Sequence, residues 1–248
     1  MLRNASAIKG YTIAASNGRI GTVSDVLFDD VSWRVRWVVV DTGNWFPGRK
    51  VLLPLSALGR LDENGSEFAV NLTMQQVKDS PDSDTDRPVS RQIEANIYDY
   101  YGWQPYWGTD MLMGGYGYGT GFGGGAVAAL PPLESRRRAE DTAAASDNDP
   151  HLRSVQAVTR YHIHATDGEI GHLDDFAIDD SDWTIRNLIV STKNWRPGKI
   201  VLIAPTSIDT INWTDNLVNL KIDRKTVKAS PAYDAPTVID RVIVETFA

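Results

Sequence analysis

The chain has 248 residues, of which 42% are hydrophobic, and this allows two ordinary domains that each bury an apolar core. Its formal net charge is -7 and no region is basic, which argues against direct binding of nucleic acid or of a strongly anionic membrane, because both need clustered Lys and Arg. There is no cysteine, so disulfides, thiolate metal ligands and a cysteine nucleophile are excluded.

The chain begins without the apolar run of a secretory signal, and it contains no run of about 18 apolar residues that could cross a bilayer. We therefore expect a cytoplasmic protein with no transmembrane segment. Peripheral association with a membrane stays open.

The first hundred residues predict short strands that alternate apolar and polar positions, or that are rich in β-branched residues. The expected strands, in chain order, are 18–28, 35–40, 51–53 and 66–72. Asp29-Asp30 and Pro47-Gly48 indicate turns between them. Thr73 is the expected N-cap of a short helix over 74–78, and residues 90–101 suit a second, amphipathic helix.

The chain repeats itself at an offset of 150 residues. Residues 17–53 and 167–203 align without gaps and are identical at 16 of 37 positions. Further on, the pattern Val-Lys-x-Ser-Pro occurs at both 77–81 and 227–231. This degree of identity indicates a duplication, so both halves should share one fold.

We expect a mainly β fold of two small, closed or nearly closed barrels, each with a short terminal helix. Between them, residues 114–125 are almost entirely Gly and Tyr, a composition that cannot bury a core. The predicted organisation is a first barrel with an aromatic tail over 1–107, a flexible, disordered linker over 108–150, and a second barrel over 151–248.

Taken together, the motifs of each half resemble the PRC-barrel. They are Gly-x-Ile-Gly at 18–21, Asp-Asp-x-x-Trp at 29–33, Asn-Trp-x-Pro-Gly-Arg at 44–49 and Val-Lys-x-Ser-Pro at 77–81. This module forms the cytoplasmic part of the photosynthetic reaction-centre H subunit and the C-terminal domain of a ribosome-maturation factor. The resemblance covers both halves, but the second ends at Ala248 and lacks the aromatic tail of the first.

The resemblance implies a docking or adaptor domain without a catalytic centre of its own. The chain lacks the membrane helix of the H subunit and the separate N-terminal domain of the maturation factor, so neither function is carried over whole, and no functional residue is transferred. A membrane photosynthetic or electron-transfer complex, docked from the cytoplasmic side, and a ribosomal protein during ribosome assembly remain alternative partners.

The tail of the first half is the strongest candidate for a partner-binding surface, since it holds six aromatic residues within ten positions. These candidate residues are Tyr98, Tyr100, Tyr101, Trp103, Tyr106 and Trp107. The alternative is that the tail folds back over its own barrel as a lid. The sequence does not decide between the two.

Other repeated residues suit the scaffold better than a site. Tight bends and turn-capping rings explain the pairs Gly18/Gly168, Gly21/Gly171, Trp33/Trp183 and Trp45/Trp195. The Asp29-Asp30 and Asp179-Asp180 pairs should bond their own backbone amides. All four histidines (His151, His162, His164 and His172) lie in the second half, and exposed strand positions explain them better than a metal site does.

The sequence thus predicts a non-enzymatic adaptor that binds a protein partner of unknown identity, with no cofactor, no metal and no catalytic residue. It leaves open whether the two barrels stay apart on their tether, pack on each other as a pseudo-dimer, or form a homodimer.

Overall fold

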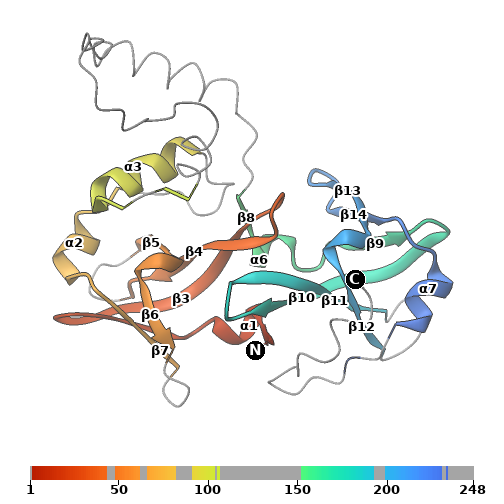
Figure 1. The fold of residues 1–248 in the computed structure, drawn as a ribbon, viewed down its shortest axis with the longest axis horizontal. Helices are drawn as coiled ribbons and strands as arrows, with labels where there is room; N and C mark the ends of the chain where they lie inside the picture. The colour runs from red at the N-terminus through yellow and green to blue at the C-terminus, as the bar shows by residue number, and fades with distance from the viewer. Residues whose placement is uncertain are drawn as a thin grey trace, which may run out of the picture.

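The computed structural model of the chain is described here for residues 2–43, 48–61, 66–81, 91–103, 105–106, 152–192, 199–230 and 233. Figure 1 shows two groups of strands, one from each half of the chain, meeting where β3 and β4 approach β10 and β11. We refer to these groups as unit 1 (residues 2–106) and unit 2 (residues 152–233). The predicted linker over 108–150 lies outside the described residues.

Unit 1 contains the strands and helices expected from the sequence, with additional short elements at its start and before its last strand. Its elements in chain order are β1 (Leu2–Asn4), α1 (Ala5–Ile8), β2 (Thr12–Ala15), β3 (Gly18–Asp29), β4 (Arg34–Asp41), β5 (Lys50–Pro54), η1 (Leu55–Ala57), β6 (Leu58–Leu61), β7 (Glu67–Val70), α2 (Met74–Lys78) and α3 (Arg91–Tyr101). Thr73 caps α2 as predicted, because its side chain accepts from the Gln76 amide while the Gln76 side chain accepts from the Thr73 amide.

Unit 2 repeats this order of elements up to the helix after its last strand. Its elements are β8 (Leu152–Ser154), α6 (Val155–Val158), β9 (His162–Ala165), β10 (Gly168–Asp179), β11 (Thr184–Ser191), β12 (Ile200–Ile203), η2 (Pro205–Ser207), β13 (Ile208–Asn212), β14 (Leu217–Leu220) and α7 (Arg224–Ala229). The pairings repeat as well, since β2–β7 and β9–β14 are parallel while β3–β4 and β10–β11 are antiparallel.

The strands of both units belong to one hydrogen-bonded sheet. Its main path runs β13-β14-β9-β10-β11-β4-β3-β2-β7-β6, so β11 and β4 join the units. At this junction the Val35 amide donates to the Trp183 carbonyl at 2.9 Å, and the Ile185 amide donates to the Trp33 carbonyl at 2.8 Å. The two bonds are related by the 150-residue offset, as expected of a pseudo-twofold contact.

The first strand of each unit pairs with the other unit. Strand β1 pairs antiparallel with β10, with Leu2 opposite Asp179, and β8 pairs antiparallel with β3, with Leu152 opposite Asp29. The helix after each strand follows it, so α1 packs on β10 and α6 packs on β3 (Figure 1). We call residues 2–8 arm 1 and residues 152–158 arm 2. The units have exchanged their arms.

The hydrophobic core is shared between the units. One cluster of buried side chains includes Ile13, Ile20 and Leu53 of unit 1 together with Ile163 and Ile170 of unit 2. The rings of Phe28 and Phe176 lie 5.3 Å apart across the junction. The expectation of two separate apolar centres is therefore wrong: the strands that join the units carry buried residues of both.

At Gly21 and Gly171, two of the repeated glycines, neighbouring backbone approaches too closely to leave room for a side chain. The sequence predicts tight bends or bulges at these glycines. A Cβ at Gly21 would lie 2.0 Å from the Asp41 carbonyl oxygen, and one at Gly171 would lie 1.9 Å from that of Ser191. Each glycine sits near a bulge on its long strand, where the register shifts. Among the residues that the structure describes, no helix is both long and apolar enough to cross a membrane.

Candidate functional site

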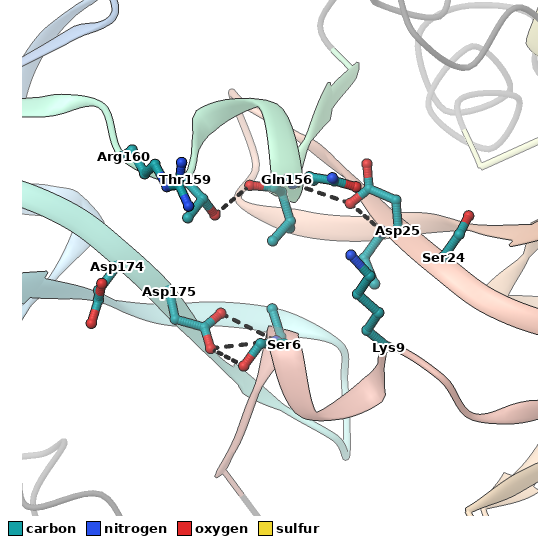
Figure 2. A pocket seen from close by; sticks show the side chains of 12 residues that line it. Ser6, Lys9, Ser24, Asp25, Gln156, Thr159, Arg160, Asp174 and Asp175 are labelled. Carbon is teal, nitrogen blue, oxygen red and sulfur yellow. Dashed lines mark hydrogen bonds between the residues drawn. The ribbon is translucent and has the colours of Figure 1, made fainter.

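A cleft of about 500 Å³ lies between the units, where the two arms face each other. Its walls come from the arms and from the middle of β3 and β10, so positions related by the offset lie on opposite sides (Figure 2). Its charged groups are Lys9, Asp25, Arg160, Asp174 and Asp175.

Asp25 and Asp175 are the central carboxylates, and each one binds the arm of the other unit. Asp175 accepts from the Ser6 hydroxyl at 2.5 Å and from the Ser6 amide at 3.2 Å. Asp25 accepts from the Ser154 hydroxyl, and from the Gln156 amide at 3.1 Å. The amides belong to the first turns of α1 and α6, which would otherwise lack acceptors there.

Each carboxylate also accepts from the next amide of its own strand, that of Val26 for Asp25 and that of Phe176 for Asp175, both at 2.8 Å. Burial raises the pKa of both groups above the ordinary value of an aspartate, and these hydrogen bonds partly oppose the shift. Lys9 extends toward Asp25 and also opposes the rise in its pKa (Figure 2).

A second pair of carboxylates fixes the outer end of each arm. Arg153 Nε lies 2.8 Å from Asp30 Oδ2, with both side chains about nine-tenths buried. Arg3 Nε lies 2.9 Å from Asp180 Oδ2 at a more exposed position. Buried charge pairs of this kind tolerate loss of one partner poorly. The acidic residues of the junction therefore act as anchors for the arms.

The aromatic tail covers the outer face of unit 1. Helix α3 places Ile97 and Tyr98 over Trp37, whose ring lies 5.0 Å from that of Tyr98. The Trp37 indole donates to Glu94 Oε1 at 2.7 Å, and the Tyr106 hydroxyl donates to the same oxygen at 3.2 Å. The tail is thus a lid on its own unit, which was one of the two alternatives left open by the sequence.

The six candidate residues fall into different environments. Tyr98 is 4% exposed, which corrects its assignment as a contact residue, because its ring is already buried under α3. Tyr101 and Trp103 are half-buried and stack on each other at 4.2 Å, while Tyr100 remains 41% exposed. Tyr106 is half-buried beneath the Arg36 guanidinium, and Trp107 lies outside the described residues.

The repeated tryptophans serve the junction. Trp33 and Trp183 have φ values of 55° and 57°, and their carbonyls accept the two bonds between β4 and β11. Trp33 stacks on Phe28 with ring centroids 5.5 Å apart, and the Trp183 ring lies 6.1 Å from that of Phe68. Trp45 and Trp195 lie outside the described residues.

Asp29 and Asp179 bond their own turns, as predicted, whereas Asp30 and Asp180, for which the same was expected, form ion pairs with Arg153 and Arg3 of the opposite arm. Asp29 Oδ1 accepts from the Ser32 amide at 2.7 Å, and Asp179 Oδ1 accepts from the Ser181 amide at 3.1 Å. Of the histidines, His162 lies 3.3 Å from Glu169 and His172 lies 3.7 Å from Asp174. Across the described part of the chain no three His, Cys, Asp or Glu side chains gather as metal ligands would.

Sequence reasoning missed the residues that hold the arms. A signal was present, since Asp25/Asp175, Asp30/Asp180 and Arg3/Arg153 are each repeated at the 150-residue offset. A carboxylate repeated in the middle of a predicted strand, directly before the apolar run 26–28 or 176–178, calls for a hydrogen-bonding partner. The sequence alone did not indicate that this partner belongs to the other half.

These features define a mainly β protein of two repeated units joined by exchanged N-terminal arms. The PRC-barrel domain family matches residues 2–72, and unit 1 therefore contains a PRC-barrel domain. The matched segment includes arm 1, which here packs on unit 2.

An uncharacterized protein of Deinococcus radiodurans is 39% identical over 75 residues, which cover 30% of this chain and 27% of that relative. The chain therefore spans about a quarter of the relative's length. The likeness supports the shared module and gives no function for the rest.

Proposed function

We propose that the chain is a non-catalytic adaptor that binds other proteins, and that residues 151–248 form a second PRC-type barrel joined to the first (1–107) by a linker over 108–150. The observation that carries this proposal is the use of the cleft carboxylates. Asp25 and Asp175 each accept hydrogen bonds from an amide and a hydroxyl of an arm. A general acid or base must reach a substrate, whereas these groups hold the protein together.

The repeated sequence supports the second barrel. Unit 2 has the same element order, the same parallel and antiparallel pairings and the same glycine at its bulge as unit 1. Its long strand carries Asp175 and Asp179 where β3 carries Asp25 and Asp29. Two units with one fold, related by a pseudo-twofold contact, offer two similar faces to a partner.

We place the partner-binding surface on the outside of the lid. Tyr100 keeps 41% of its surface exposed, and it lies edge-on to Tyr101 with ring centroids 4.8 Å apart. Trp103 stacks behind Tyr101, so the three rings form one continuous aromatic surface. Exposed Tyr and Trp with rigid neighbours are typical of interface hot spots.

The test is affinity capture by the intact chain and by two surface variants, Tyr100→Ala and Trp103→Ala. We expect both variants to lose at least about tenfold in affinity for a partner identified with the intact chain, as hot-spot truncation costs about 2 kcal/mol. Val31→Ala is the matched control, since Val31 is 71% exposed in the turn between β3 and β4 and does not belong to the aromatic tail.

Thermal unfolding of each variant separates lost binding from lost folding. Equal recovery of the partner by all variants would place the surface elsewhere. Turnover of any substrate by the purified chain, abolished by Asp25→Asn, would overturn the adaptor proposal itself.

A further inference from the structure

We infer that the exchanged arms also allow two chains to associate, with arm 1 of each chain seated on β3 of a second copy. In such a dimer the first units of the two chains pair with each other around a twofold axis, and the second units pair likewise. This inference does not depend on the proposed adaptor role.

The two arms carry the same anchoring groups. Leu2 and Leu152 occupy the same position and are 1% and 2% exposed, respectively. Arg3 and Arg153 follow them, and each forms an ion pair with the other unit. The serine donors differ by two positions, but Ser6 and Ser154 both give a hydroxyl to the central carboxylate of the other unit.

The two receiving strands are equivalent as well. Asp25 of β3 and Asp30, directly after β3, bind arm 2, and Asp175 of β10 and Asp180, directly after β10, bind arm 1. Since these carboxylates match at the 150-residue offset, β3 offers arm 1 every charged group that arm 1 uses on β10. The bonds between β4 and β11 join backbone atoms only, so they are equally available to two copies of β4.

The tryptophan contacts are compatible with pairing of like units. We call the single chain, in which each arm packs on the other unit of the same chain, the closed chain. In the closed chain Trp183 of unit 2 lies against Phe68 of unit 1. At the equivalent place on the other side of the pseudo-twofold contact, Trp33 of unit 1 lies near Val218 of unit 2, beside a cavity of about 10 Å³. Val218 stands where unit 1 has Phe68. In the dimer both Trp33 rings would gain a Phe68 neighbour in the pair of first units, while both Trp183 rings would meet Val218 in the pair of second units, so the number of each kind of contact is unchanged.

Other contacts favour the closed chain over the dimer. Phe28 faces Phe176 in the closed chain, but in the dimer it would face the smaller Val26 in unit 1 of the second chain. The Tyr233 hydroxyl of unit 2 also donates to Asn4 of arm 1 at 2.8 Å. Covalent connection adds an effective concentration in the millimolar range for a short flexible connection, so the dimer should depend on concentration.

The test uses the full chain and exploits its lack of cysteine. Chains carrying Arg3→Cys and chains carrying Asp30→Cys are mixed in denaturant, refolded together and treated with a short bismaleimide. We expect a cross-linked species of twice the chain mass, with a dimer-to-monomer ratio that rises in proportion to total concentration while the dimer is minor.

Two controls make the outcome decisive. The double variant Arg3→Cys/Asp180→Cys should cross-link within one chain, which shows that the reagent reaches the arm. A mixture of Arg3→Cys with Glu67→Cys, an exposed position on β7, should give no interchain product above background. Absence of the Arg3–Asp30 product at every concentration, with the intrachain control positive, would overturn the inference.

If mixtures of the single variants Arg3→Cys and Asp180→Cys cross-link while those of Arg3→Cys and Asp30→Cys do not, chains exchange only between unlike units. That result would also overturn the pairing of like units.

Discussion

Truncation of Leu152 tests whether unit 1 depends on unit 2 for its stability. Leu152 is the first described residue of unit 2, yet its side chain is 2% exposed in a cluster with Leu27, Trp37 and Leu52 of unit 1. The same cluster holds Ile97 and Tyr98 of the lid. Leu152→Ala would leave a cavity beneath α3, and such changes in packed cores cost about 2–5 kcal/mol.

Hydrogen exchange of the intact chain provides the assay, because it measures the opening of each segment separately. A cost of about 2 kcal/mol corresponds to a roughly thirtyfold rise in the population of the open state. We expect amides of α3 and β5 to exchange faster by at least this factor.

Leu2→Ala is the matched control on the other side of the pseudo-twofold contact. Leu2 is 1% exposed in a cluster with Ala177, Ile189 and Tyr233 of unit 2. This variant should loosen β10 to β12 and leave α3 protected. If Leu152→Ala changes exchange only in unit 2, or Leu2→Ala only in unit 1, the arms are not seated as described and the reasoning is refuted.

Three further predictions concern the cleft, the bulge and the linker. Burial raises the folded-state pKa of Asp25 and Asp175 above 3.8, so the folded protein keeps these protons to higher pH than the unfolded chain does. The free energy of unfolding should therefore fall as pH rises from about 3.8 through the folded pKa. Urea unfolding at a series of pH values should show this fall in the natural chain relative to a variant with Asn at both positions; a constant difference would contradict it. Gly21→Ala should lower the unfolding free energy by more than about 2 kcal/mol, because its Cβ would lie 2.0 Å from a backbone oxygen, and an unchanged melting temperature would contradict it. Replacing residues 109–149 with a Gly–Ser loop of about six residues should leave the fold intact and raise stability by roughly 1 kcal/mol, as judged by urea unfolding, since a shorter loop costs less to close.

Local structure could be predicted well from the sequence. Alternation of apolar and polar residues located β3, and the β-branched run located β4, because both patterns record burial on one or both faces of a strand. Thr73 marked the start of α2 through its capping chemistry, and residues 90–101 suggested a helix that the structure describes as α3.

The arrangement of these elements could not be predicted, for reasons of length and distance. Strands β1 and β8 have three residues each, too few for an alternating pattern, and their partners lie 177 and 123 residues away, counted from Leu2 to Asp179 and from Asp29 to Leu152. The lid depends on a hydrogen bond between Trp37 and Glu94, which are 57 residues apart. The composition shows that the tail is rich in aromatic residues. Which of its rings face inward depends on the buried carboxylate of Glu94, which accepts hydrogen bonds from Trp37 and Tyr106.

Exchange of the arms changes how the linker should be understood. Tyr106, at the end of the lid, packs against the cluster that contains Leu152, at the start of arm 2. The chain therefore leaves unit 1 and enters unit 2 at neighbouring points, and the span between them does not require some forty residues. A tether that lets two independent barrels reach separate partners would have no reason to begin and end in one apolar cluster. We therefore expect both units to meet a partner as one body, with their relative orientation fixed by Asp25, Asp175 and the shared core, and removal of the linker should leave partner affinity unchanged.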